Sequence, residues 1–222
     1  MFIKKMNKAV ILLALLSISA FAQGTFTDSR DGKKYKSVKI GEQTWMAQNL
    51  DYQGEDGNLG KCYDDKPENC TKYGRLYDWA TAMNIDAKFN YEVWRNTDTS
   101  NVKHSDICPE GWHLPSREEW STLRDFAGGE KVAGKKLKAK NGWNKYENKN
   151  GNGTDNYGFS GLPGGSGNSN GSFRDIGSYG LWGTGSGGSN RTPALSMVSG
   201  LDNLSNLDYG KSGLISVRCL KD

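Results

Sequence analysis

The sequence has little of what metal sites and nucleophilic catalysis need. It contains only two histidines, His104 and His113, and no pair of its cysteines has the C-x2-C spacing that is typical of zinc sites. No serine or cysteine stands in a recognisable nucleophile elbow, and no pair of carboxylates stands out. We therefore predict no resident cofactor and no enzymatic activity.

The chain also lacks a strong excess of one charge. It has 29 Lys and Arg against 25 Asp and Glu, and three of the lysines, Lys4, Lys5 and Lys8, lie at the N terminus. Without those three, the formal net charge falls from +4 to +1. No basic block and no basic stripe interleaved with aromatics is present. This balance gives no electrostatic signature of a nucleic-acid-binding surface, so we expect no nucleic-acid partner.

Long hydrophobic runs are absent except at the N terminus. An apolar run over residues 9–21 follows the three lysines, and Ala20-Phe21-Ala22 fits the small-x-small cleavage rule. A membrane anchor is the alternative, but the run is short for a span and no stop-transfer pattern follows. No cysteine stands directly after the cleavage site, which disfavours a lipoprotein. We predict a signal peptide over residues 1–22 and one domain over residues 23–222, periplasmic, secreted or on the outer surface, with no transmembrane segment after cleavage.

All four cysteines, Cys62, Cys70, Cys108 and Cys219, lie in the predicted mature chain. An even number in an oxidising compartment indicates two disulfides, for which three connectivities are possible. We favour Cys62 with Cys70, which closes a small loop, and Cys108 with Cys219, which ties the end of the chain to its middle. A metal site is the alternative, and the spacing and the lack of histidine disfavour it.

Glycine and aromatic residues are frequent instead. The chain has 29 glycines, and 11% of its residues are aromatic. Between residues 148 and 190, aromatic residues stand among many glycines. Flexible linkers lack such aromatic residues. We expect ordered loops in which glycine allows positive φ angles and aromatic side chains fill the core.

The segment from Cys108 to Trp120 organises the predicted fold. Ser116 and Glu119 form a capping box, so a helix should begin directly after Ser116. Trp120, Leu123 and either Phe126 or Ala127 recur at helical spacing, and Gly128-Gly129 should end the helix.

Other elements are predicted from periodicity. Two short strands should lie between residues 25 and 50, with a turn at Asp31-Gly32 and Trp45 in the core. Residues 51–71 should form a polar loop, and residues 73–83 a helix with Leu76, Trp79, Ala80 and Met83 on one face. Residues 193–198 and 213–220 should be strands.

Five segments together resemble the Fibrobacter succinogenes major paralogous domain family. They are residues 43–50 (QTWMAQNL), 74–79 (GRLYDW), 108–115 (CPEGWHLP), 158–165 (GFSGLPGG) and 216–219 (SVRC). The resemblance runs from about residue 27 to residue 222. It implies an exported bacterial protein and supplies no established activity.

A wider similarity concerns the fold. Residues 112–120 (WHLPSREEW) and 217–219 (VRC) are similar to segments of the formylglycine-generating sulfatase-modifying group. That similarity implies an α+β, C-type-lectin-like, loop-rich fold with two short helices and a twisted antiparallel sheet. The group's copper-binding cysteine pair does not carry over, because no cysteine lies between Cys108 and Cys219. The calcium-binding motifs of C-type lectins are also absent.

We expect the function to lie in an exposed aromatic patch formed by part of a larger set of rings, although any single ring of that set is better explained as part of the core. Flat rings stack on sugars while nearby polar groups bind hydroxyls, and candidate residues of these types are Trp143, Tyr146, Tyr157, Tyr179, Trp182, Asn190 and Arg191. The predicted function is a non-catalytic binding module for polysaccharide or other cell-envelope components. The alternatives are a structural or adhesive surface scaffold that binds proteins, and an enzyme derived from the sulfatase-modifying fold.

Two further groups of residues are weaker candidates for a site. His113 could act as a general base, but its neighbours favour a packed histidine that bonds to backbone. Oxygen ligands for calcium could come from Asp202, Asn203, Asn206 and Asp208, although a solvated turn explains these residues better.

Overall fold

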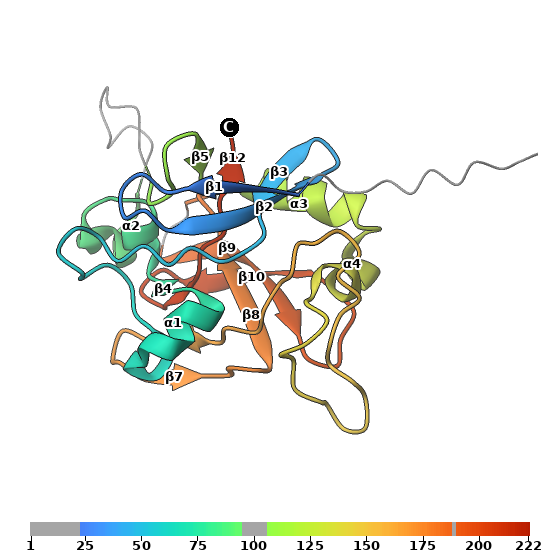
Figure 1. Ribbon diagram of the computed structural model, residues 1–222. Coiled ribbons are helices and arrows are strands. Elements are labelled where there is room, and N and C mark those ends of the chain that lie inside the picture. Colours follow the sequence, from blue (N-terminus) through green and yellow to red (C-terminus); the bar gives the residue numbers. More distant parts are fainter. Residues whose placement is uncertain (1–22, 95–105, 188–189) are drawn as a thin grey trace, which may run out of the picture.

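Two antiparallel-rich sheets of five strands each form the body of the protein, as Figure 1 shows for the computed structural model. The structure describes residues 23–94, 106–187 and 190–222. The predicted signal peptide, residues 1–22, lies outside the described residues. The broad α+β class is confirmed, with few and short helices between the strands.

The first sheet has the order β1-β2-β3-β12-β5. Its strands are β1 (Gln23–Thr27), β2 (Lys34–Ile40), β3 (Gln43–Met46), β12 (Leu220–Lys221) and β5 (Trp112–His113). All its pairs are antiparallel, and Leu220 pairs with both Trp45 and His113. The end of the chain therefore lies between two strands that are far away in sequence.

The second sheet has the order β10-β9-β8-β11-β4. Its strands are β10 (Ser205–Gly210), β9 (Arg191–Val198), β8 (Tyr179–Gly183), β11 (Ile215–Ser216) and β4 (Leu76–Tyr77). The pair β11–β8 is parallel, and the other pairs are antiparallel. A separate ribbon pairs β6 (Ser166–Gly167) with β7 (Phe173–Arg174).

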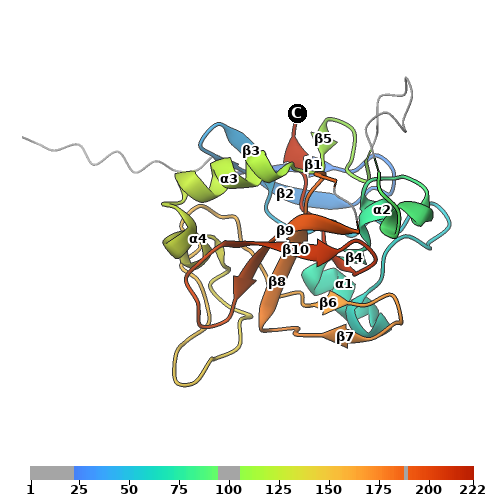
Figure 2. The ribbon, with the colours of Figure 1, turned by 180° about the vertical axis from the view of Figure 1, so that it is seen from behind.

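Short helices surround the sheets. They are η1 (Tyr63–Asp65), α1 (Pro67–Tyr73), α2 (Trp79–Ala82), η2 (Ala87–Asn90), α3 (Arg117–Phe126) and α4 (Glu130–Leu137). Figure 2 shows α3 alongside β2 and β3, with α4 following it at the edge of the molecule.

The N-terminal strands follow from alternation and from one turn. Residues 34–40 alternate between exposed and buried positions, so one face of β2 meets the core. The predicted Asp31-Gly32 turn joins β1 to β2, and Gly32 has the positive φ, 73°, that favours glycine. Trp45 is fully buried, as predicted, although the region forms three strands rather than two.

Helix α3 has the predicted ends. Ser116 accepts a hydrogen bond from the backbone N–H of Glu119, whose side chain in turn accepts from the backbone of Ser116. Trp120, Leu123 and Ala127 are buried, whereas Phe126 is about half exposed. The capping box and the apolar spacing are thus confirmed.

The helix predicted over residues 73–83 is wrong in its extent. Leu76 and Tyr77 form a strand, because they pair with Ser216 and Ile215 of β11. The helix α2 covers only Trp79–Ala82, capped by Asp78. The predicted burial is confirmed, because the residues predicted to share a face, Leu76, Trp79, Ala80 and Met83, are all buried. Only the predicted helical backbone at Leu76 is wrong, because this residue pairs with β11. The segment predicted as a polar loop contains α1, which begins at Pro67.

Aromatic rings form the centre of the core. Trp45 lies 4.6 Å from Trp120 between ring centres, and Phe159 lies 5.9 Å from each of them. Trp182 completes the cluster at 6.2 Å from Trp120. Rings from β3, α3, β8 and a glycine-rich loop therefore meet in one place, as the composition predicted.

Both predicted disulfides are present. Cys62 bonds to Cys70 across η1 and the start of α1, and Cys108 bonds to Cys219, 111 residues later. The second bond fixes β12 beside the chain that leads to α3. Among the described residues, no helix combines the length and the apolar character that crossing a bilayer requires.

The two disulfides should differ in their effect on stability. In the chain-entropy account, replacing Cys108 and Cys219 together by serine lowers the free energy of unfolding by about 5 kcal/mol, because the closed loop is long. The same change at Cys62 and Cys70 should cost about 2–3 kcal/mol. Urea unfolding of both double variants measures this. A larger loss for the short loop would contradict the expectation.

Candidate functional site

An open groove of about 980 Å³ is the largest hollow described on the protein. Six segments contribute to its lining, namely residues 23–25, 33–37, 47–51, 70–74, 139–141 and 155–162. In Figure 1 these segments belong to β1, β2, the chain after β3, the end of α1 and the loops that follow α4. The groove is therefore a product of the tertiary fold and not of any one loop.

Asn49 lines the groove and forms a buried contact with Arg218, and we call these two residues the floor of the groove. Asn49 Oδ1 accepts hydrogen bonds from Arg218 Nε at 3.0 Å and from Nη2 at 2.7 Å. Arg218 Nη1 donates to the carbonyl of Phe159, and the guanidinium lies 4.2 Å from the centre of that ring. The guanidinium, 1% exposed, thus bonds to uncharged oxygens.

Burial shifts the titration of this arginine. Loss of solvation lowers the pKa of Arg218 to about 9, while the nearby Asp155 carboxylate acts in the opposite direction. The guanidinium therefore stays charged at neutral pH. A positive charge lies directly beneath the segments that line the groove.

Asn49 joins four parts of the chain. Its Nδ2 donates to the carbonyl of Tyr73 at 2.8 Å and to Ser216 Oγ at 3.2 Å. Its Oδ1 also accepts from Trp182 Nε1 at 2.9 Å. Gly74 lets the chain pass this close, because it has a φ of 77° and an added Cβ would lie 2.7 Å from the Cβ of Asn49.

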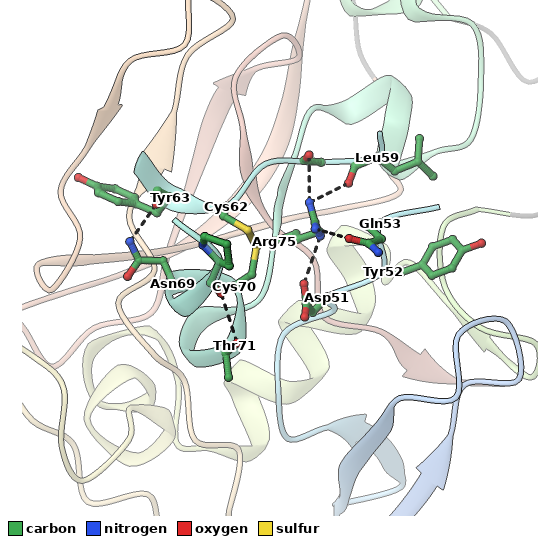
Figure 3. Close-up of a disulfide and its surroundings, with 12 residues drawn as sticks. Asp51, Tyr52, Gln53, Leu59, Cys62, Tyr63, Asn69, Cys70, Thr71 and Arg75 are labelled. Carbon is green, nitrogen blue, oxygen red and sulfur yellow. Dashed lines mark hydrogen bonds and ion pairs between the residues drawn. A yellow bond between two sulfur atoms is a disulfide. The ribbon is translucent and has the colours of Figure 1, made fainter. Parts of the chain in front are cut away.

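One wall of the groove is the helix α1, which is fastened at its middle and just beyond its C-terminal end (Figure 3). The Cys62–Cys70 disulfide holds the middle of α1 to the chain before it. Just after α1, Arg75 forms an ion pair with Asp51 at 3.2 Å, and its Nη2 donates to Gln53 Oε1 at 2.7 Å. These contacts tie α1 to the loop that follows Leu50.

A buried lysine fastens the opposite side. Lys138 is 1% exposed, and its Nζ donates to the carbonyls of Val198 at 2.9 Å and Leu201 at 2.6 Å. Its neighbours, residues 139–141, line the groove. The wall is therefore anchored to the second sheet.

The predicted aromatic patch does not form as a unit. Trp143 and Trp182 are buried, so their inclusion in an exposed site was wrong. Inside the protein their Nε1 atoms donate to the carbonyl of Gly161 and to Asn49 Oδ1, respectively. Tyr157 is partly buried against Phe126, 5.6 Å away between ring centres.

The remaining candidates are exposed but lie apart from the groove. Tyr146 lies over Gly200, and Tyr179 pairs with Val198 across β8 and β9. Asn190 and Arg191 lie at the start of β9, where Arg191 donates to the carbonyl of Asp208. None of the seven predicted residues lines the groove. Sequence reasoning missed Arg218, whose signal was a single arginine inside the apolar run Ile215–Leu220.

His113 bonds to two carboxylates, and not to backbone as predicted. Its Nε2 lies 2.9 Å from Glu119 Oε1, and its Nδ1 lies 2.7 Å from Asp222 Oδ1. The hydrogen bond to Glu119 is the main cause that raises the pKa of His113 to about 9, although partial burial opposes it. At neutral pH the imidazole is therefore a cation that joins β5 to α3 and to the residue after β12.

The four residues considered for calcium do not form a loop. Asn206 and Asp208 are exposed on β10, and Asp202 and Asn203 precede that strand. In the described part of the chain, no group of three or more His, Cys, Asp or Glu side chains is arranged to hold a metal.

A second hollow of about 340 Å³ contains Tyr91 and Phe173. Its polar groups are partly used within the fold. Asp78 Oδ1 accepts from Thr81 N and from Asn90 Nδ2, while Asn90 Oδ1 accepts from Ala80 N. These groups cap α2, so the larger groove is the better candidate site.

The titration of His113 should appear in the stability of the protein. The pKa of His113 is higher in the folded protein than in the unfolded chain, so the protonated imidazole stabilises the fold. With Glu119 ionised, this stabilisation is complete below about pH 6.5 and is lost as the pH rises through about 9. The melting temperature of wild type should thus exceed that of His113→Gln near pH 6, and the difference should close above pH 9. A difference that does not change between these pH values would contradict this origin.

Comparison with known proteins gives the family. A model of the Fibrobacter succinogenes major domain matches residues 38–221. No curated protein matches the chain. No solved structure matches it. Three of the segments that carry the resemblance meet beneath the groove, where residues 43–50 supply Asn49, residues 158–165 supply the Phe159 carbonyl, and residues 216–219 supply Arg218. The chain belongs to the Fibrobacter succinogenes major domain family.

Proposed function

We propose that the protein is an exported, non-catalytic module that binds polysaccharide or a related cell-envelope component in the groove. The observation that carries this proposal is the groove itself, an open hollow of about 980 Å³ with fixed walls. An open groove that is lined by six segments of the chain suits a polymer that lies across it. A buried cavity would suit a small molecule instead.

Polar side chains around the groove fit the chemistry of sugar hydroxyls. Amide and hydroxyl groups both donate and accept hydrogen bonds, as hydroxyl groups of a sugar do. Those that line the groove include Gln23, Ser37, Gln48, Thr71, Asn141 and Ser160. They replace the exposed aromatic patch as the proposed contact surface.

Fixed walls lower the entropic cost of binding. The Cys62–Cys70 disulfide holds α1, Arg75 ties α1 to the preceding loop, and Lys138 holds residues 139–141. A site whose walls are already ordered loses less conformational freedom when a ligand binds.

The absence of catalysis is part of the proposal. His113 does not line the groove, and its two carboxylate partners keep it protonated at neutral pH. A protonated imidazole cannot accept a proton as a general base. Among the alternatives, this weighs against an enzyme built around His113.

Export and the finer fold also remain parts of the proposal. Two disulfides are typical of an oxidising compartment, which supports export after cleavage near Ala22. The capped α3 and the closing strand β12 support a C-type-lectin-like arrangement of the sulfatase-modifying type. A surface scaffold that binds envelope proteins is the remaining alternative.

Blocking the groove tests the proposal. Thr71 lies on the exposed side of α1 and lines the groove, so Thr71→Trp should lower the affinity for a bound polysaccharide by about 10-fold or more, which corresponds to about 1.4 kcal/mol. Affinity electrophoresis against a panel of plant and envelope glycans measures the change. The panel should include neutral and acidic polymers.

Thr122→Trp is the matched control. Thr122 is exposed on α3 and does not line the groove, and both threonine hydroxyls donate to the carbonyl four residues earlier. The control should keep wild-type affinity. Equal losses in both variants, or retention of no glycan by the wild type, would refute the proposal and leave the scaffold alternative.

A further inference from the structure

The groove gathers positive charge that the chain as a whole does not show. Five lysines line it, against the two carboxylates of Asp51 and Asp155. The lysines are Lys33, Lys34, Lys36, Lys72 and Lys140. Over the whole sequence, by contrast, basic and acidic residues nearly balance, 29 against 25. The basic excess is thus local to the groove.

The two carboxylates are already engaged. Asp51 pairs with Lys33 Nζ at 2.9 Å and with Arg75 Nε at 3.2 Å. Asp155 accepts hydrogen bonds from the backbone N–H of Ser160 at 2.8 Å and from its hydroxyl at 2.7 Å. Neither forms an ion pair with the other four lysines.

Those four lysines are exposed and come from three elements. Lys34 and Lys36 lie two residues apart on β2, on either side of the buried Tyr35, so their side chains leave the same face about 7 Å apart. Lys72 lies in the last turn of α1, and its Nζ lies 4.8 Å from the centre of the Tyr73 ring. Lys140 belongs to the wall that Lys138 anchors. Ammonium groups therefore surround the groove.

The buried guanidinium of Arg218 adds to the positive charge of these lysines. Arg218 lies buried below Asn49, and its hydrogen bonds go to uncharged oxygens. A charge in a low-dielectric interior is screened little by salt, so it acts on a ligand in the groove above.

Aromatic rings do not contribute a stacking surface. The aromatic residues that line the groove are Tyr35 and Tyr73, and both are buried. Single-stranded nucleic acid is held by stacked bases, and neutral sugars commonly stack on exposed rings. The groove offers ion pairs and hydrogen bonds instead, which suits a chain of sugars that carries its own negative charges.

We propose that the groove binds an acidic polysaccharide, whose carboxylate or sulfate groups contact Lys34, Lys36, Lys72 and Lys140 while its hydroxyls contact the polar side chains between them. This inference rests on the proposed function and names its ligand class. It predicts that charge on the polymer, and not the identity of the backbone sugar, decides the affinity.

The test compares a polymer with its own uncharged form. Polygalacturonate and its fully methyl-esterified form share a backbone and differ in charge. The protein without residues 1–22 should bind polygalacturonate at least about 10-fold more tightly than the ester at low salt, and added salt should weaken only the former. Dextran sulfate and neutral dextran repeat the comparison for sulfate groups, so the two pairs tell which anion is preferred.

Lysine substitutions test the site. At low salt, Lys36→Gln, Lys72→Gln and Lys140→Gln should each weaken binding by about 2- to 5-fold, and the variant with all four lysines changed by about 20-fold or more. Lys131→Gln is the control, because Lys131 is exposed on α4 and does not line the groove. Melting curves should match wild type throughout, since the side chains are exposed.

The outcomes separate this inference from the function on which it rests. Binding that Thr71→Trp abolishes, but that is equal for charged and neutral polymers, overturns the anionic ligand and keeps the groove as a glycan site. Charge-dependent binding that Lys131→Gln weakens as much as Lys72→Gln overturns the site. Lysine-dependent binding of poly(dT) and of neither acidic polymer also overturns the inference. Retention of no polymer refutes both proposals.

Discussion

The contact between Asn49 and Arg218 is the interaction on which the rest of the structure depends. A guanidinium with almost no exposure needs its hydrogen bonds satisfied within the protein, since an unpaired buried charge costs several kcal/mol. Asn49 satisfies two of them with one oxygen, and the Phe159 carbonyl accepts a third. The chain after β3, the glycine-rich loop and the segment between β11 and β12 are therefore held together by these groups.

The same contact joins the core to the groove. Below it, Trp182 donates to Asn49 and packs against the rings around Trp120. Above it, the chain that carries Asn49 and the loop that carries Phe159 line the groove. The Cys108–Cys219 disulfide holds the neighbour of Arg218, so covalent and polar constraints act on adjacent residues. The backbone segments that line the groove are thus joined to the core by hydrogen bonds and by a disulfide.

Local signals in the sequence predicted local features well. The Cys62–Cys70 disulfide, the Ser116 capping box and the Asp31-Gly32 turn depend on residues close in sequence, and all three are present. Helix α1 was missed because its seven residues, PENCTKY, are mainly polar, although Pro67 was a usable start signal.

Features that depend on distant partners could not be predicted in the same way. Leu76 has helical spacing with Trp79, but pairing with β11 decides the backbone of Leu76 and Tyr77. The type of a residue also does not reveal its exposure, because Trp182 suits a sugar platform and a core equally well until Asn49 supplies a partner for its Nε1. The lysines of the groove come from segments that are far apart in a sequence with nearly balanced charges. Their clustering was therefore not visible in the sequence.

A double-mutant cycle on the buried contact tests the central claim most directly. Asn49→Leu should destabilise the protein by about 3–5 kcal/mol, because it leaves the Arg218 charge without its main partner. Adding Arg218→Met should recover a large part of that loss, since the buried charge is then removed. Urea unfolding of the two single variants and the double variant gives the coupling energy. A coupling energy near zero, with losses that simply add, would contradict the dependence of this fold on Asn49 and Arg218.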